Sequence, residues 1–90
     1  MIIASWNINS IRVRLESIKK WVKERNPDII LFQEIKCQNS DFPESFFLKN
    51  GYHSLINGQK GRNGVAILVK EELSSDNNQI VINNFIDINQ

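Results

Sequence analysis

Two polar clusters near the start of the chain carry the side chains best suited to chemistry. Residues 6–11 (WNINSI) include Asn7, and residues 31–36 (LFQEIK) include Glu34. Carboxylate and amide oxygens are ligands that Mg²⁺ accepts, together with water and the oxygens of a substrate phosphate. Each cluster closes an apolar run, so a fold that places the ends of both runs side by side would create a metal or phosphate site.

The apolar runs before the two clusters predict neighbouring parallel strands. Residues 1–8 and residues 28–33 are continuous apolar and β-branched stretches, typical of strands covered on both faces. A helical pattern separates them, and a strand, a helix and a strand in this order imply a right-handed crossover. Both clusters should then lie at the carboxyl edge of one sheet, where open α/β sheets bind ligands.

The helix between the strands should begin soon after Asn9 or Ser10, either of which could cap it. Its apolar side chains recur with helical spacing along one face: Ile11, Leu15, Ile18 and Val22. Asn26 precedes a proline, and proline disfavours helix in the residue before it. We therefore expect the helix to end at Asn26.

Glu34 is the strongest candidate for a metal ligand, because it follows a buried strand and should sit at the rim of the core. Asn7 would orient a phosphate or help to hold the ion. The alternative is that the two side chains only tie loops together. Asp28 cannot share this site, since it begins the strand that Glu34 ends and, at about 3.3 Å per residue, should lie roughly 20 Å away.

A glycine-rich loop at residues 58–64 is a second candidate for binding phosphate. Its three glycines let backbone N–H groups turn toward an anion, while Lys60 and Arg62 add positive charge. The alternative is an ordinary hairpin turn, because residues 52–56 and 65–69 are typical of two strands that flank it.

Length and composition limit the chain to one small domain. It has 90 residues, of which 41% are hydrophobic, and we treat residues 1–90 as part of a single domain. A short helix is expected at residues 43–50 and a further strand at residues 79–88.

The charge and the cysteine content limit the kinds of binding partner and the cellular compartment that we expect. The formal net charge of +1 excludes a strongly basic protein, but six of the eleven Lys and Arg residues lie between Arg12 and Arg25. Arg12 could bind a backbone phosphate of an anionic partner, or it could be a solvated surface side chain. Cys37 is the only cysteine, so no intrachain disulfide can form and a cytoplasmic location is expected. The apolar N-terminus is too short for a membrane span, so no membrane partner is expected.

Four motifs in order make the sequence resemble a known family. Residues 5–12, 27–30, 33–36 and 58–66 resemble the N-terminal part of exonuclease III, in the abasic-site endonuclease group of the endonuclease/exonuclease/phosphatase superfamily. The resemblance extends from residue 1 to about residue 72. It implies an α/β sandwich of two sheets packed face to face, incomplete in this chain.

The resemblance also implies an activity and the residues that perform it. Members of this family are DNA repair nucleases that use Mg²⁺, with Mn²⁺ as an alternative, to cut double-stranded DNA at abasic sites and to trim 3′ ends. Glu34 and Asn7 match the family's metal carboxylate and active-site asparagine, which assigns both to catalysis and metal binding. Asn9 stands where some relatives have an aspartate near the metal. The implied DNA contacts are Asn9, Arg12, Lys36, Gln59, Lys60, Gly61 and Arg62.

The family's later motifs, which supply a tyrosine near the phosphate and the groups that activate water, have no counterpart here. We therefore expect the chain alone to be inactive or very weak and to need a complementing C-terminal half. One alternative is a non-catalytic remnant or weak DNA-binding module. Another is an enzyme of the same superfamily that acts on phospholipids or inositol phosphates, although the loop at residues 58–61 favours DNA.

Overall fold

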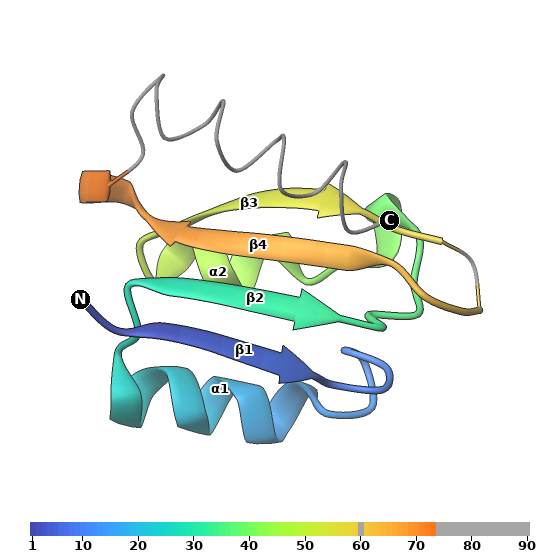
Figure 1. Cartoon of the computed structure of the whole chain (residues 1–90), viewed down its shortest axis with the longest axis horizontal. Coiled ribbons are helices and arrows are strands. Elements are labelled where there is room, and N and C mark those ends of the chain that lie inside the picture. The colour runs from blue at the N-terminus through green and yellow to red at the C-terminus, as the bar shows by residue number, and fades with distance from the viewer. Residues whose placement is uncertain (60, 74–90) are drawn as a thin grey trace.

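A mixed four-stranded sheet forms the centre of the computed structural model, which describes residues 1–59 and 61–73 (Figure 1). The strand order is β1-β2-β4-β3. The strands are β1 (Ile3–Asn7), β2 (Ile29–Gln33), β3 (Tyr52–Asn57) and β4 (Val65–Lys70). β1 and β2 run parallel, whereas β4 pairs antiparallel with both β2 and β3. These observations confirm the α/β class, the parallel strands and the hairpin; the strand expected at residues 79–88 lies outside the described residues.

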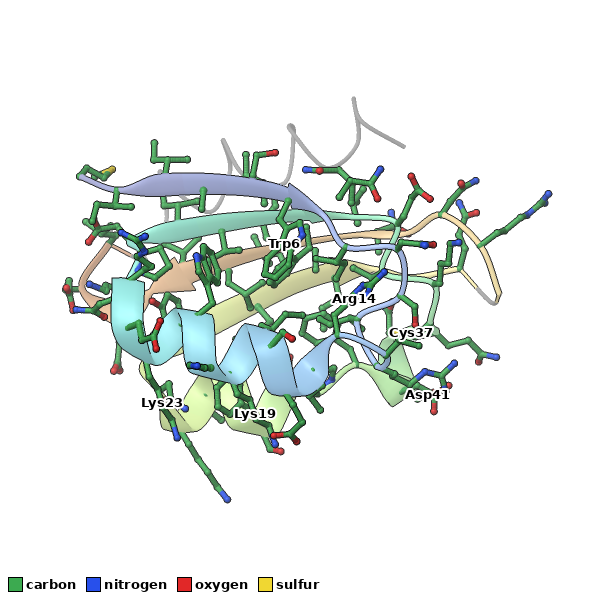
Figure 2. All side chains as sticks on the ribbon, turned by 90° about the horizontal axis from the view of Figure 1, so that it is seen from below. Trp6, Arg14, Lys19, Lys23, Cys37 and Asp41 are labelled. Carbon is green, nitrogen blue, oxygen red and sulfur yellow. The ribbon has the colours of Figure 1, made fainter. Side chains whose placement is uncertain are left out.

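Two helices, α1 (Leu15–Arg25) and α2 (Glu44–Lys49), cover one face of the sheet (Figure 2). Ile18 and Val22 from α1 and Phe47 from α2 are buried in one core with Phe32 of β2. The rings of Phe32 and Phe47 lie 6.0 Å apart between centroids. Short 3₁₀ turns occur at Asn39–Asp41 and Glu71–Leu73. In the described part of the chain, no helix is long and apolar enough to cross a membrane.

The first strand is less covered than its apolar sequence predicts. Ile3 is 59% exposed, and Ser5 and Asn7, which alternate with it on the same face, are also exposed. The expectation of a strand buried on both faces is therefore wrong for β1. The reason is its position: β1 is an end strand of the sheet, and α1 covers only the face that carries Trp6.

The first helix begins later than its apolar spacing predicts. Neither Asn9 nor Ser10 caps it, because α1 starts at Leu15 with Arg14 as the preceding residue. Ser10 and Ile11 instead donate backbone hydrogen bonds to the carbonyls of Glu34 and Ile35, so the chain continues alongside its neighbour before it turns into the helix. The predicted end is confirmed, since Asn26 adopts a left-handed φ of 48° and its N–H returns to the Val22 carbonyl.

Asp28 fastens the end of the sheet opposite the polar clusters. Its carboxylate accepts a hydrogen bond of 2.6 Å from the Ile2 N–H and lies 3.4 Å from the Lys70 ammonium. The Ile2 bond, helped by Lys70 and opposed by partial burial, holds the pKa of Asp28 below its ordinary value. Nearby, the Tyr52 hydroxyl donates to the Pro27 carbonyl. The prediction that Asp28 stands apart from Glu34 is confirmed by these contacts.

Candidate metal and phosphate site

Three loops meet at the carboxyl ends of β1 and β2. The Ile8 N–H donates to the Gln33 carbonyl at 3.1 Å, which continues the parallel pairing beyond the strands. On the other side, the Ile35 and Lys36 N–H groups donate to the carbonyls of Gly64 and Asn63 at 3.1 and 2.9 Å. Backbone bonds therefore hold the segment after β2 between the segment after β1 and the loop that joins β3 to β4.

Asn7 and Glu34 are in direct contact at this edge. The Asn7 Nδ2 group donates a hydrogen bond to Glu34 Oε2, across 27 positions of sequence. Asn7 is exposed and the Glu34 side chain is 41% exposed, so both remain accessible to solvent and to a ligand. The sequence-based expectation that the two clusters lie side by side is confirmed.

A second pair links the same two segments. The Lys36 ammonium donates to Asn9 Oδ1 and lies 4.0 Å from Glu34 Oε1. Glu34 therefore has an amide donor beside one carboxylate oxygen and a cation beside the other. Asn7, Asn9, Glu34 and Lys36 form what we call the polar edge.

The backbone of the polar edge is strained. Asn9, Glu34 and Lys36 have φ angles of 45°, 51° and 53°, in the left-handed region that side chains other than asparagine and glycine rarely adopt. Each such residue costs on the order of 1–2 kcal/mol, which the surrounding hydrogen bonds must offset. In a strand, successive side chains point to opposite faces of the sheet. A left-handed residue at the end of a strand breaks this alternation and so changes the direction in which the next side chains point.

The polar edge fits a hard divalent cation held by few protein ligands. Within residues 1–59 and 61–73, no group of three or more His, Cys, Asp or Glu side chains converges in a way that could hold a metal. Glu34 supplies one accessible carboxylate and Asn7 a neighbouring amide. Mg²⁺ accepts such a site, since it commonly keeps several waters and takes one or two carboxylates together with substrate phosphate oxygens.

The glycine-rich loop lies against the segment that follows β2. The Gly58 N–H donates to Asn39 Oδ1 at 2.7 Å, and Asn39 Nδ2 donates to the Ile56 carbonyl at 3.3 Å. A Cβ atom built on Gly58 would lie 2.3 Å from the Cys37 carbonyl oxygen, so only glycine fits. Gly61, in contrast, is open and has a φ of 74°.

The remaining candidates for DNA contact differ in how closely the structure ties them to the polar edge. Arg12 is exposed in the turn between β1 and α1, because the helix begins at Leu15 and not soon after Ser10 as expected. Arg62 is exposed at the tip of the β3–β4 loop, and Gln59 is half-buried at its start. Lys60 lies outside the described residues. Among the residues described, no side-chain hydrogen bond or ion pair joins Arg12, Gln59 or Arg62 to Glu34, whose partners are Asn7 and Lys36.

Asn39 and Arg14 are structural contributors that sequence reasoning missed. Asn39 Oδ1 accepts a hydrogen bond from Gly58 at the start of the glycine-rich loop. The Arg14 Nε donates to the Ile8 carbonyl at 3.3 Å, which stabilises the turn before α1. Their types gave no signal, because both contacts depend on loop paths that only the folded chain defines.

Neither His53 nor Cys37 joins the polar edge. His53 pairs with Val69 in the row that contains Ile3 and Ile29, at the opposite end of the strands from Asn7. Cys37 is buried, and this burial raises the pKa of its thiol. Among the residues described, the one histidine and the one cysteine therefore lie outside the polar edge.

The sequence and fold are similar to those of DNA-processing proteins. Residues 4–88 match the Endonuclease/Exonuclease/phosphatase family. Exodeoxyribonuclease III of Haemophilus influenzae is 41% identical over 68 residues, which cover 76% of this chain and 26% of that protein. An AP endonuclease structure from Archaeoglobus fulgidus is 51% identical with a TM-score of 0.72, over 77% of this chain and 27% of that one.

A further similar structure contains DNA. A 3′ phosphatase from Neisseria, solved with a product DNA hairpin, is 39% identical with a TM-score of 0.73. The match covers 77% of this chain and 27% of the phosphatase. This chain therefore spans about a quarter of the length of the relatives that it matches.

Proposed function

Because this chain belongs to the endonuclease/exonuclease/phosphatase family, we propose that its polar edge takes part in metal-dependent hydrolysis of DNA phosphodiester bonds at abasic sites and 3′ ends. The observation that carries the proposal is the contact between Asn7 and Glu34 at the carboxyl edge of two parallel strands. The named activities of the similar proteins, exodeoxyribonuclease III and AP endonuclease, supply the substrate class. The DNA hairpin bound to the Neisseria phosphatase also favours a DNA substrate.

Each residue of the proposed site has a stated part. Glu34 would hold Mg²⁺, or Mn²⁺ in its place, through its accessible carboxylate, with Asn7 beside it. A bound divalent cation would supply charge stabilisation to the phosphoryl group undergoing attack. Asn7 donates to the Glu34 carboxylate and so helps to orient it, and the Asn7 amide would also lie close to a phosphate bound beside the metal. Exposed Arg12 and Arg62, with Lys60, Gln59 and Gly61, would contact the DNA backbone.

A second candidate function is DNA binding without cleavage. It is favoured by one observation: among the described residues, no group of three or more Asp, Glu, His or Cys side chains converges in a way that could hold a metal. Hydrolysis also requires a group that activates water, and neither Asn7 nor Lys36 is an evident general base. A complementing segment would have to provide this group.

The test is cleavage of a duplex containing one abasic analogue, with Mg²⁺ and the purified chain. We expect the chain alone to act at least about a thousandfold more slowly than an intact relative, since positioning and water activation contribute on that order. Residual cleavage should be lost in Glu34→Gln and kept in Asp28→Asn, which removes a carboxylate from the far end of β2. Equal cleavage by the wild type and Glu34→Gln would contradict the proposed site, and binding without cleavage would support the second candidate.

A further inference from the structure

Lys36 lies beside the carboxylate that is proposed to hold the divalent cation. Its ammonium lies 4.0 Å from Glu34 Oε1, while Asn7 donates to the other oxygen, Oε2. The Lys36 side chain is 33% exposed and that of Glu34 is 41% exposed. The ion pair therefore lies at the surface, where either side chain can leave the other for a new partner. Oε1 is thus the carboxylate oxygen that a metal would take, and it already faces a positive charge.

Apart from Glu34, the residues of the polar edge around Lys36 are neutral. Asn9 Oδ1 accepts a hydrogen bond from Lys36, but Asn9 is a neutral amide. Asn7 is neutral as well, so Glu34 is the one carboxylate of the polar edge and the formal charge of the four residues is zero. A divalent ion that binds here must displace or tolerate the lysine, and like charges within a few ångströms repel.

We propose that Lys36 is a positioning residue that competes with the divalent cation for Glu34 and so sets the metal affinity of the polar edge. The inference rests on the proposed function in that Glu34 is taken as the metal carboxylate. The role differs from that of a DNA contact, because the Lys36 ammonium pairs with Glu34 Oε1 while no metal is bound. With a metal bound, the hydrogen bond to Asn9 Oδ1 would keep the ammonium near the site, where it would favour an incoming phosphate.

The competition predicts an effect opposite to that of a structural lysine. Removal of the charge in Lys36→Met should tighten Mn²⁺ binding about threefold to tenfold, since exposed ion pairs and like-charge neighbours have effects of this order. Lys36→Arg keeps the charge and should retain the wild-type affinity within about twofold. If Lys36 only supported the fold, Lys36→Met would weaken binding and lower thermal stability together.

The experiment is calorimetric titration of the full chain with Mn²⁺ at constant pH and ionic strength, with circular dichroism to confirm folding. The matched control is Lys70→Met, which removes a lysine and its ion pair with Asp28 at the opposite end of the sheet. It should leave the Mn²⁺ affinity unchanged. Lys36→Gln is a second variant if the methionine substitution impairs folding.

A double-mutant cycle separates the two proposals. If Glu34→Gln leaves Mn²⁺ binding unchanged, or the wild type and all Lys36 variants bind none, Glu34 is not a metal ligand and both proposals fail. If binding requires Glu34 but Lys36→Met and Lys36→Gln weaken it or leave it unchanged, only the competition is overturned. The competition is supported if Lys36→Met tightens Mn²⁺ binding in the wild type but not in the Glu34→Gln background. It is contradicted if Lys36→Met tightens Mn²⁺ binding equally in both backgrounds.

Discussion

At the scale of single residues, the predictable part of the site is the part that follows from strand direction. Asn7 and Glu34 could be placed together from the sequence, because the carboxyl ends of adjacent parallel strands share one edge. The contact of Lys36 with Asn9 could not, since it depends on left-handed φ angles at both residues. Lysine gives no sequence signal for that conformation, and asparagine only a weak one.

Tyr52 provides a test at the same scale. The side chain is buried, and this burial, reinforced by the Asp28 and Glu72 charges, raises the pKa of Tyr52 to about 12 from its usual 10.0. Between these values the unfolded chain loses the phenolic proton while the folded chain keeps it, so stability should fall as the pH rises from about 10 to about 12. Tyr52→Phe removes this titration and also the bond to Pro27, which contributes about 1 kcal/mol.

Urea unfolding at pH 8 and at pH 11 checks the prediction. Tyr52→Phe should be less stable than the wild type at pH 8, and the difference should shrink or reverse at pH 11. Both proteins carry the same other ionisable groups, so only the difference between their stabilities reports on Tyr52. A difference that stays constant from pH 8 to pH 11 would contradict the assigned pKa.

At the scale of elements, the order of strands and helices was predictable and their boundaries were less so. The apolar spacing correctly placed Ile11, Ile18 and Val22 in one core, but Ile11 reaches it from a turn and not from the helix. Periodicity reports which side chains are buried, and it cannot tell a helical residue from a loop residue that continues the backbone pairing beyond a strand.

The packing of the glycine-rich loop against the segment that contains Cys37 and Asn39 gives a prediction at this scale. Gly58→Ala should destabilise the chain by about 3 kcal/mol, because the new Cβ would overlap the Cys37 carbonyl oxygen at 2.3 Å. Gly61→Ala is the matched control: no atom lies within 4 Å of its Cβ position, so only the positive φ opposes it, at about 1 kcal/mol. Denaturant unfolding of both variants checks the order, and a Gly61 substitution as costly as that of Gly58 would contradict the proposed packing.

At the scale of the whole molecule, the sheet has two polar ends with different tasks. The end near Asp28 joins the N-terminal residues, β2 and β4 through Ile2 and Lys70, and its contacts are satisfied within the chain. The other end carries the polar edge, where Glu34 stays accessible on a strained backbone. Strained residues with accessible functional groups are typical of binding and catalytic sites.

The structural end predicts an acid dependence of stability. The pKa of Asp28 is lowered in the folded chain, chiefly by the Ile2 N–H, so its contribution to stability is present above the ordinary aspartate pKa and is lost as the pH falls through the lowered value. Asp28→Asn should remove that part of the pH dependence. Thermal unfolding at pH 6 and at pH 3 measures it: the wild type should lose more stability on acidification than the variant. Equal losses would contradict the role of Asp28.

The central claim is that a divalent cation binds at the Glu34 end of the sheet, and paramagnetic NMR tests it most directly. Substoichiometric Mn²⁺ added to the ¹⁵N-labelled chain should first broaden the amide signals of Asn7, Asn9, Glu34 and Lys36 and the side-chain NH₂ of Asn7. Signals of Asp28, His53 and Lys70, at the opposite end, should stay sharp. Broadening centred on Asp28, or broadening at Glu34 that persists unchanged in Glu34→Gln, would contradict the account.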